Sequence, residues 1–164
     1  MTAALELSTN QVTHLYSKKK NTLEMIRLME LLIHKYAHFR KLYFSWDSAS
    51  WHGSKKLNRW VKQVNDSDFR ARNSTPLIEL APLPAGAQFL NVIEGVFSGL
   101  ARAVIHNSDY QSVNEAKAAI NRYFQERNDY FQRHPKRAGK KIWGKERTPC
   151  RFSETQNYKD PRWR

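Results

Sequence analysis

The chain has 164 residues, close to the size of one typical domain, and its 28 lysines and arginines against 15 acids give a formal net charge of +13. Hydrophobic residues make up 40% of the chain and aromatic residues 12%, which excludes a purely disordered basic protein. The charge favours a polyanionic partner, with nucleic acid as the first candidate.

The segment from Met1 to Leu7 has neither the basic region nor the long apolar region of a secretion signal. No stretch approaches the ~20 apolar residues that a membrane span needs. The single cysteine, Cys150, can form neither an internal disulfide nor a cysteine-rich zinc site. We therefore expect a cytoplasmic protein with no membrane partner.

The first elements predicted along the chain are a hairpin and a helix. Two short extended segments, 4–7 and 11–16, are joined by polar residues that favour a turn. Asn21 can cap a helix with Glu24 three residues on, and apolar residues then recur at helical spacing. This pattern predicts a helix over about 22–37.

The middle of the chain predicts two strands separated by a helix. The apolar run 42–46 is typical of a buried strand that ends at Asp47. Residues 57–64 repeat the spacing of a helix with one buried face, and 77–80 form a short strand between two prolines. The predicted order so far is strand, helix, strand, helix, strand.

Two further helices complete the predicted domain. A third helix carries apolar residues between Leu90 and Val104, and a fourth opens with the capping box Ser112 to Glu115 and runs to about Phe131. We therefore expect an α/β domain over residues 1–132 that ends in two helices.

The last 32 residues, 133–164, are predicted to be a basic, flexible tail. They hold 11 lysines and arginines against three acids, or +8 of the total +13. A solvated basic end is one interpretation. Aromatic residues between the cations instead suit DNA contact through phosphates and stacked bases. The predicted DNA-binding residues are Lys136, Arg137, Lys140, Lys141, Trp143 and Lys145.

Two carboxylates stand out by their position. Asp47 ends an apolar strand, and Glu94 lies on a helix between Leu90 and Phe97. An ionised carboxylate beside buried surface needs a cation, either a basic side chain or a metal ion. Sites in open α/β sheets form beyond the carboxyl ends of strands, and hard oxygen ligands suit Mg²⁺ or Mn²⁺. A structural salt bridge and a metal site both remain open at this point.

Two segments resemble motifs of one known family. Residues 80–94 (LAPLPAGAQFLNVIE) resemble the segment that leads to the third acid in bacterial mariner-like insertion-sequence transposases, where Leu-Pro precedes a Leu-Asn-Pro-Ile-Glu-like motif. Residues 44–52 (FSWDSASWH) are similar to the second-acid motif of that family, an Asp-Asn pair followed by His. The resemblance covers roughly residues 4–145.

The resemblance implies an RNase H-like mixed sheet with flanking helices, in which Asp, Asp and Glu bind two divalent metals. Such enzymes cleave phosphodiester bonds and transfer strands at transposon ends. The matching acids are Asp47 and Glu94, with Asn91 and His52 as supporting residues and Mg²⁺ or Mn²⁺ as cofactor. Converging carboxylates are needed because two metals activate the attacking oxygen and stabilise the leaving one.

The chain departs from the family pattern at three places. Ser48 replaces the common Asn, Val92 replaces the common Pro, and the first acid with its central strand has no counterpart. Glu6, the only acid before Glu24, is a poor substitute because alternation sends it to the face opposite its apolar neighbours. We therefore expect the C-terminal part of a transposase, either a remnant or one product of a split or frameshifted gene.

Three functions follow as alternatives. The first is a DDE-type transposase part that acts on DNA with Mg²⁺, incomplete alone and completed by a separate N-terminal transposase segment. The second is a non-catalytic DNA-binding remnant or regulator that associates with intact transposase. The third is an unrelated RNase H-like nuclease.

Overall fold

The predicted hairpin is present at the N-terminal end of the chain. The structure is a computed structural model that describes residues 1–46, 54–83 and 90–139. Strands β1 (Thr2–Glu6) and β2 (Gln11–Leu15) pair antiparallel. Asn10 closes the turn in the left-handed region at φ 61°, and its N–H donates to the Glu6 carbonyl at 2.8 Å.

Helix α1 (Thr22–Lys35) confirms the predicted cap and the predicted apolar face. The Asn21 side chain accepts a hydrogen bond from the Glu24 N–H at 3.1 Å, which satisfies one of the open donors at the helix start. The buried face of the helix consists of Ile26, Leu28, Met29, Leu32 and Ile33. The helix packs against both β1 and β2 and also against α2, so it underlies most of the N-terminal half.

The second pair of strands is parallel. Strands β3 (Lys41–Phe44) and β4 (Leu77–Leu80) are connected through α2 (Lys55–Val64) and α3 (Ser67–Asn73). The strand predicted over 42–46 is observed over 41–44, one residue shorter than expected. Backbone hydrogen bonds to the segment after β4 nevertheless continue as far as Trp46. Helix α3 was not predicted, because seven mostly polar residues show no apolar period.

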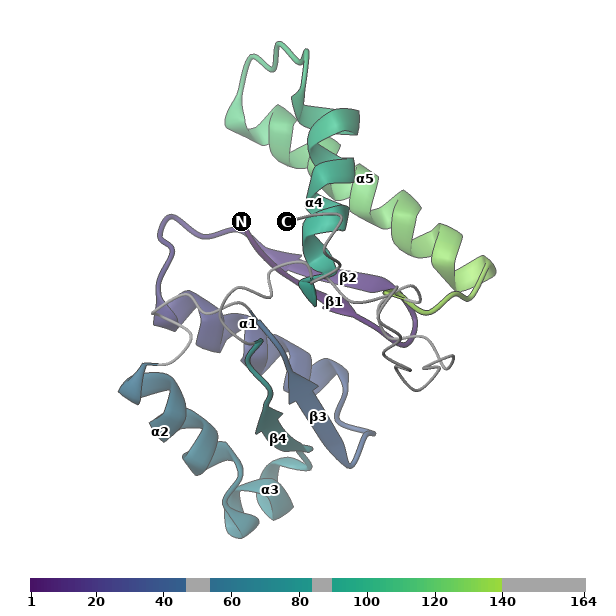
Figure 1. Cartoon of the computed structure of the whole chain (residues 1–164). Coiled ribbons are helices and arrows are strands. Elements are labelled where there is room, and N and C mark those ends of the chain that lie inside the picture. The colour runs from purple at the N-terminus through teal and green to yellow at the C-terminus, as the bar shows by residue number, and fades with distance from the viewer. Residues whose placement is uncertain (47–53, 84–89, 140–164) are drawn as a thin grey trace, which may run out of the picture.

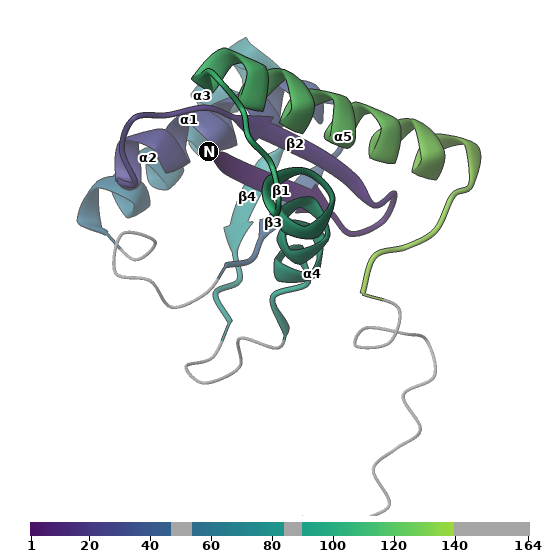
Figure 2. The ribbon, with the colours of Figure 1, turned by 90° about the horizontal axis from the view of Figure 1, so that it is seen from above.

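The third predicted helix consists of two pieces, α4 (Ile93–Leu100) and a π-helical stretch, η3 (Ala101–Ile105). Helix α5 (Val113–Arg133) confirms the fourth, and the Ser112 side chain accepts from the Glu115 N–H at 3.1 Å. Figure 2 shows α5 running along the hairpin, with α4 on the same part of the molecule.

The buried residues form two clusters instead of one. The first joins α1 and α2 to the parallel pair through Ile26, Met29, Ile33, Trp46, Leu57, Val64 and Ile78. The second joins the hairpin to α4 and α5 through Val12, Val96, Leu100 and Phe124. The fold class is thus the expected one, a mixed α/β arrangement of small sheets with flanking helices.

The four strands form two separate two-stranded sheets (Figure 1). An asparagine covers the outer edge of each. The Asn128 amide bonds both backbone groups of Val12 on β2, and the Asn65 amide bonds both backbone groups of Ile78 on β4. The other edges of β1 and β3 carry no such cover among the described residues, and no backbone pairing joins them.

Candidate catalytic edge

The candidate site lies beyond the carboxyl ends of β3 and β4. The Ala81 N–H donates to the Phe44 carbonyl at 2.7 Å, and the Leu83 N–H donates to the Trp46 carbonyl at 2.8 Å. Trp46 is buried in the first core cluster. The chain is therefore held firmly up to the residue before Asp47. Asp47 and His52 themselves, like Ser48, lie outside the described residues.

Glu94 occupies the first turn of α4, where a carboxylate is favourable because the helix dipole is positive at this end. The Asn91 side-chain amide donates to the Glu94 carboxylate at 3.3 Å, and the Glu94 N–H donates to the Asn91 carbonyl at 3.1 Å. Neighbouring Ile93 packs into the second core cluster and fixes the orientation of the helix. The structure therefore brings together Asn91 and Glu94.

The sequence argument that Glu94 needs a compensating cation was wrong. Its side chain is exposed, although Ile93 and Phe97 beside it are part of the second core cluster. An exposed carboxylate keeps its hydration and has no desolvation cost to offset. The case for a metal at Glu94 therefore rests on its place in the motif and on its chemistry as an oxygen donor.

The described residues supply only part of a metal site. The Glu94 carboxylate and the Asn91 amide are hard donors of the kind that Mg²⁺ and Mn²⁺ prefer. However, no group of three His, Cys, Asp or Glu side chains converges anywhere in the described ranges. The meeting of Asp47 with Glu94 stays a prediction, because Asp47 is outside those ranges.

Glu6 is engaged elsewhere in the fold. Its carboxylate accepts hydrogen bonds from the Tyr36 hydroxyl at 2.7 Å and from the Ser8 hydroxyl at 2.5 Å. Tyr36 caps the end of α1, in the segment that enters β3 at its amino end. Trp46 lies past the carboxyl end of the same strand, so Glu6 is held away from the candidate edge.

The first two residues of the predicted DNA-binding set are described. Lys136 and Arg137 are both exposed, and they lie three and four positions beyond the end of α5 at Arg133. The next residue, Ala138, is buried, and its N–H donates to the Leu7 carbonyl at 2.8 Å, which anchors this segment on the hairpin turn. Lys140, Lys141, Trp143 and Lys145 lie outside the described residues.

Sequence reasoning missed two arginines that the fold brings together. Arg40 and Arg70 are 30 positions apart, the first directly before β3 and the second on α3 within the crossover to β4, and both line one hollow. Neither belongs to a motif that the sequence reasoning singled out, so only their shared place in the hollow reveals them.

Comparison with known proteins supplies the remaining observations. Residues 1–117 match the model of a protein family described as DDE superfamily endonuclease. The matched segment runs from the hairpin into α5, and it contains Asp47, Asn91 and Glu94. Neither the curated proteins nor the solved structures include a significant match to the chain. Across the described ranges, no helix has the length and apolar character needed to cross a membrane.

Proposed function

The chain belongs to the DDE superfamily endonucleases, and we propose that it is the part of a mariner-like insertion-sequence transposase that cuts and joins DNA at transposon ends. The observation that carries this proposal is the family match over residues 1–117, which contains both acids of the motif. An exposed Glu94, oriented by Asn91 at the start of α4, supports it.

In this proposal Asp47 and Glu94 are the catalytic and metal-binding acids. Asn91 positions the Glu94 carboxylate through the 3.3 Å hydrogen bond, and His52 supports Asp47. When bound, two divalent ions, Mg²⁺ or Mn²⁺, supply charge for the attacking and the leaving oxygen of the phosphodiester. The chain's own contribution would be to position the two carboxylates, because each acid directly follows a residue packed in a core cluster, Asp47 after Trp46 and Glu94 after Ile93.

The sheet edges support an incomplete enzyme. The carbonyls of Phe44 and Trp46 point toward β4. Because successive residues of a strand point their backbone groups to opposite sides, the N–H and carbonyl of Tyr43 point away from β4, to the open edge of β3. The N–H and carbonyl of Val12 point away from β1, to Asn128. Leu5 is paired with Val12, and in such a pair both residues point their backbone groups outward, so the groups of Leu5 point away from β2. Open strand edges of this kind are templates for another strand. We propose that a separate N-terminal transposase segment, bearing the first Asp, pairs between β1 and β3.

A second candidate function is a non-catalytic DNA-binding regulator. The formal net charge of +13 suits a chain that binds DNA, whether or not the chain also cuts it. The same open edges would let such a chain associate with intact transposase.

The test is a nicking assay on a transposon-end duplex with Mg²⁺. The full chain is assayed alone and with a polypeptide that supplies a strand ending in Asp. We expect little cutting by the chain alone and clear cutting by the mixture. The Glu94→Gln and Asp47→Asn variants should abolish that cutting, whereas Glu30→Gln, which changes an exposed acid on α1, should not.

Each other outcome decides between the candidates. Robust nicking by the chain alone that Asp47→Asn abolishes would contradict incompleteness. DNA binding without cutting in every mixture would support the regulator. Cutting that survives Glu94→Gln would contradict the assignment of the acids.

A further inference from the structure

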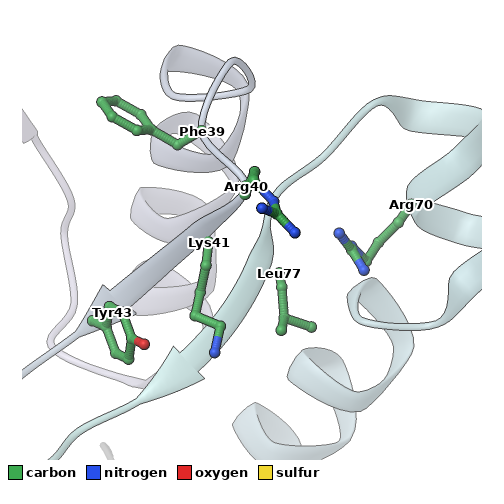
Figure 3. Close-up of a pocket in the computed structure, with 6 residues that line it drawn as sticks. All are labelled: Phe39, Arg40, Lys41, Tyr43, Arg70 and Leu77. Atoms are coloured by element: carbon green, nitrogen blue, oxygen red, sulfur yellow. The ribbon is translucent and has the colours of Figure 1, made fainter.

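A hollow with a strongly basic lining opens at the amino ends of β3 and β4 (Figure 3). It lies at the opposite end of the parallel pair from Trp46 and is therefore separate from the candidate catalytic edge. We refer to it as the arginine hollow. Its lining residues are Phe39, Arg40, Lys41, Tyr43, Arg70 and Leu77.

Two guanidinium groups converge in the arginine hollow. Figure 3 shows the side chains of Arg40 and Arg70 pointing toward one another above Leu77. The third cation, Lys41, forms an ion pair with Glu79 at 2.9 Å. No acid pairs with either arginine within the described residues. Two like charges that face one another repel, and an anion between them would remove the repulsion.

The fold anchors the backbone of Arg40, and both the backbone and the side chain of Arg70. The Arg40 carbonyl accepts the Leu77 N–H at 3.0 Å, which ties its backbone to β4. The Arg70 N–H donates to the Asp66 carbonyl at 2.9 Å, and its Nε donates to the Thr75 carbonyl at 3.4 Å. The remaining guanidinium donors of Arg70, and all those of Arg40, have no partner in the described ranges. Guanidinium forks of this kind match the geometry of a phosphate.

Two exposed aromatic residues also line the arginine hollow. Phe39 is 45% exposed and Tyr43 is 64% exposed, so both rings are accessible from solvent. The Lys41 ammonium lies 5.3 Å from the centre of the Tyr43 ring. Cations beside open aromatic faces are typical of surfaces that bind unpaired nucleotides, because the rings stack on bases while the cations contact phosphates.

We propose that the arginine hollow is a second DNA contact, which binds a backbone phosphate between Arg40 and Arg70 and stacks an adjacent unpaired base on Tyr43. This proposal rests on the proposed function in one respect, that the chain acts on DNA. The shared chemistry is a phosphate group, and free phosphate is the alternative source. The DNA bound here has unpaired nucleotides, because a duplex keeps its base faces covered.

The test measures fluorescence anisotropy of labelled single-stranded and duplex oligonucleotides with the full chain at several salt concentrations. The Arg40→Gln variant removes a side chain without internal partners, so its fold should be intact. We expect roughly tenfold weaker binding by Arg40→Gln combined with Arg70→Gln, and a salt slope lower by about 0.7, the contribution of one single-strand phosphate. Tyr43→Ala should weaken single-strand binding at least about fivefold and leave duplex binding nearly unchanged. Arg102→Gln, an exposed arginine on η3, is the matched control.

Several results would overturn the proposal. One is equal affinity for the Arg40→Gln and Arg102→Gln variants. Another is displacement of DNA by millimolar inorganic phosphate as effectively as by unlabelled oligonucleotide, which would indicate a small-anion site. The readout is independent of cutting. A chain that binds through these arginines but never nicks DNA contradicts only the catalytic proposal, and nicking with unchanged binding by the variants contradicts only the arginine hollow.

Discussion

Asn128 completes the hydrogen bonding of Val12 across 116 positions of the chain. Its side-chain Oδ1 accepts the Val12 N–H at 2.8 Å, and its Nδ2 donates to the Val12 carbonyl at 2.8 Å. These are the two bonds that a neighbouring strand would make. The helix α5 thereby closes the outer edge of the hairpin without contributing a strand, and the open side of that hairpin is left as the side for pairing.

Replacing Asn128 by leucine should lower the free energy of unfolding by about 2 kcal/mol, because both backbone groups of Val12 lose their partner at a half-buried position. Urea unfolding of the full chain measures this. The matched control is Gln132→Leu, an exposed amide on the same helix. A loss no larger than that of the control would show that water replaces Asn128 without cost.

The two glycines of α4 should respond oppositely to alanine. A Cβ on Gly95 would meet nothing within 4 Å, so Gly95→Ala should stabilise the helix by about 0.5 to 1 kcal/mol. A Cβ on Gly99 would lie 2.8 Å from the Tyr123 hydroxyl oxygen, so Gly99→Ala should lose that gain and destabilise the packing of α4 on α5. Thermal unfolding compares the two. Adding Tyr123→Phe to Gly99→Ala should recover stability, and failure to recover would disprove the clash.

The Glu6 carboxylate should make stability sensitive to acid. Partial burial raises the pKa of Glu6, but hydrogen bonds from Ser8, Tyr36 and Thr9 and the charge of Lys35 outweigh it, so the pKa lies below its ordinary 4.5. A carboxylate whose pKa is lower in the folded than in the unfolded state stabilises the fold. The stabilisation is complete at a pH above the unfolded-state pKa, and it is lost as the pH falls through the folded-state pKa. Glu6→Gln should therefore be less stable at neutral pH and decline less steeply below pH 4.5. A parallel decline in both proteins would contradict this.

Tyr36 should show the opposite dependence. Burial and the hydrogen bond to Glu6 raise the pKa of Tyr36 above its ordinary 10.0. A hydroxyl whose pKa is higher in the folded than in the unfolded state stabilises the fold. The stabilisation is complete at a pH below the unfolded-state pKa, and it is lost as the pH rises through the folded-state pKa. Tyr36→Phe should cost about 1 kcal/mol at neutral pH and should remove part of the loss of stability above pH 10. Chemical unfolding at several pH values above and below 10 measures the free energy of unfolding of both proteins. An equal loss of stability above pH 10 in the two proteins would contradict the role of Tyr36.

The basic tail should strengthen duplex binding through phosphates. Neutralising Lys136, Arg137, Lys140 and Lys141 to glutamine should weaken binding and flatten its salt dependence, because fewer counterions are released. Lys136 and Arg137 are exposed beside an anchor, Ala138 on the hairpin, so their loss should leave the fold intact. Titrations at several salt concentrations with unchanged affinity would show that the tail does not contact DNA.

The sequence by itself was sufficient for the local elements. The caps at Asn21 and Ser112 and the apolar periods behind them depend on residues three or four positions apart, so they form wherever the chain goes. The hairpin turn at Asn10 is equally local. The motif containing Asn91 and Glu94 was also readable, because the two residues meet within one turn.

Only the tertiary structure decided what happens between elements. Three features depend on how α2, α3, α4 and α5 pack: the exposure of Glu94, the asparagine that covers each strand edge, and the placement of Arg40 opposite Arg70. These contacts join residues 13 to 116 positions apart and leave no periodic trace in the sequence. The division into two sheets has the same origin, because backbone pairing carries no side-chain signal and is determined by which strands packing brings alongside each other.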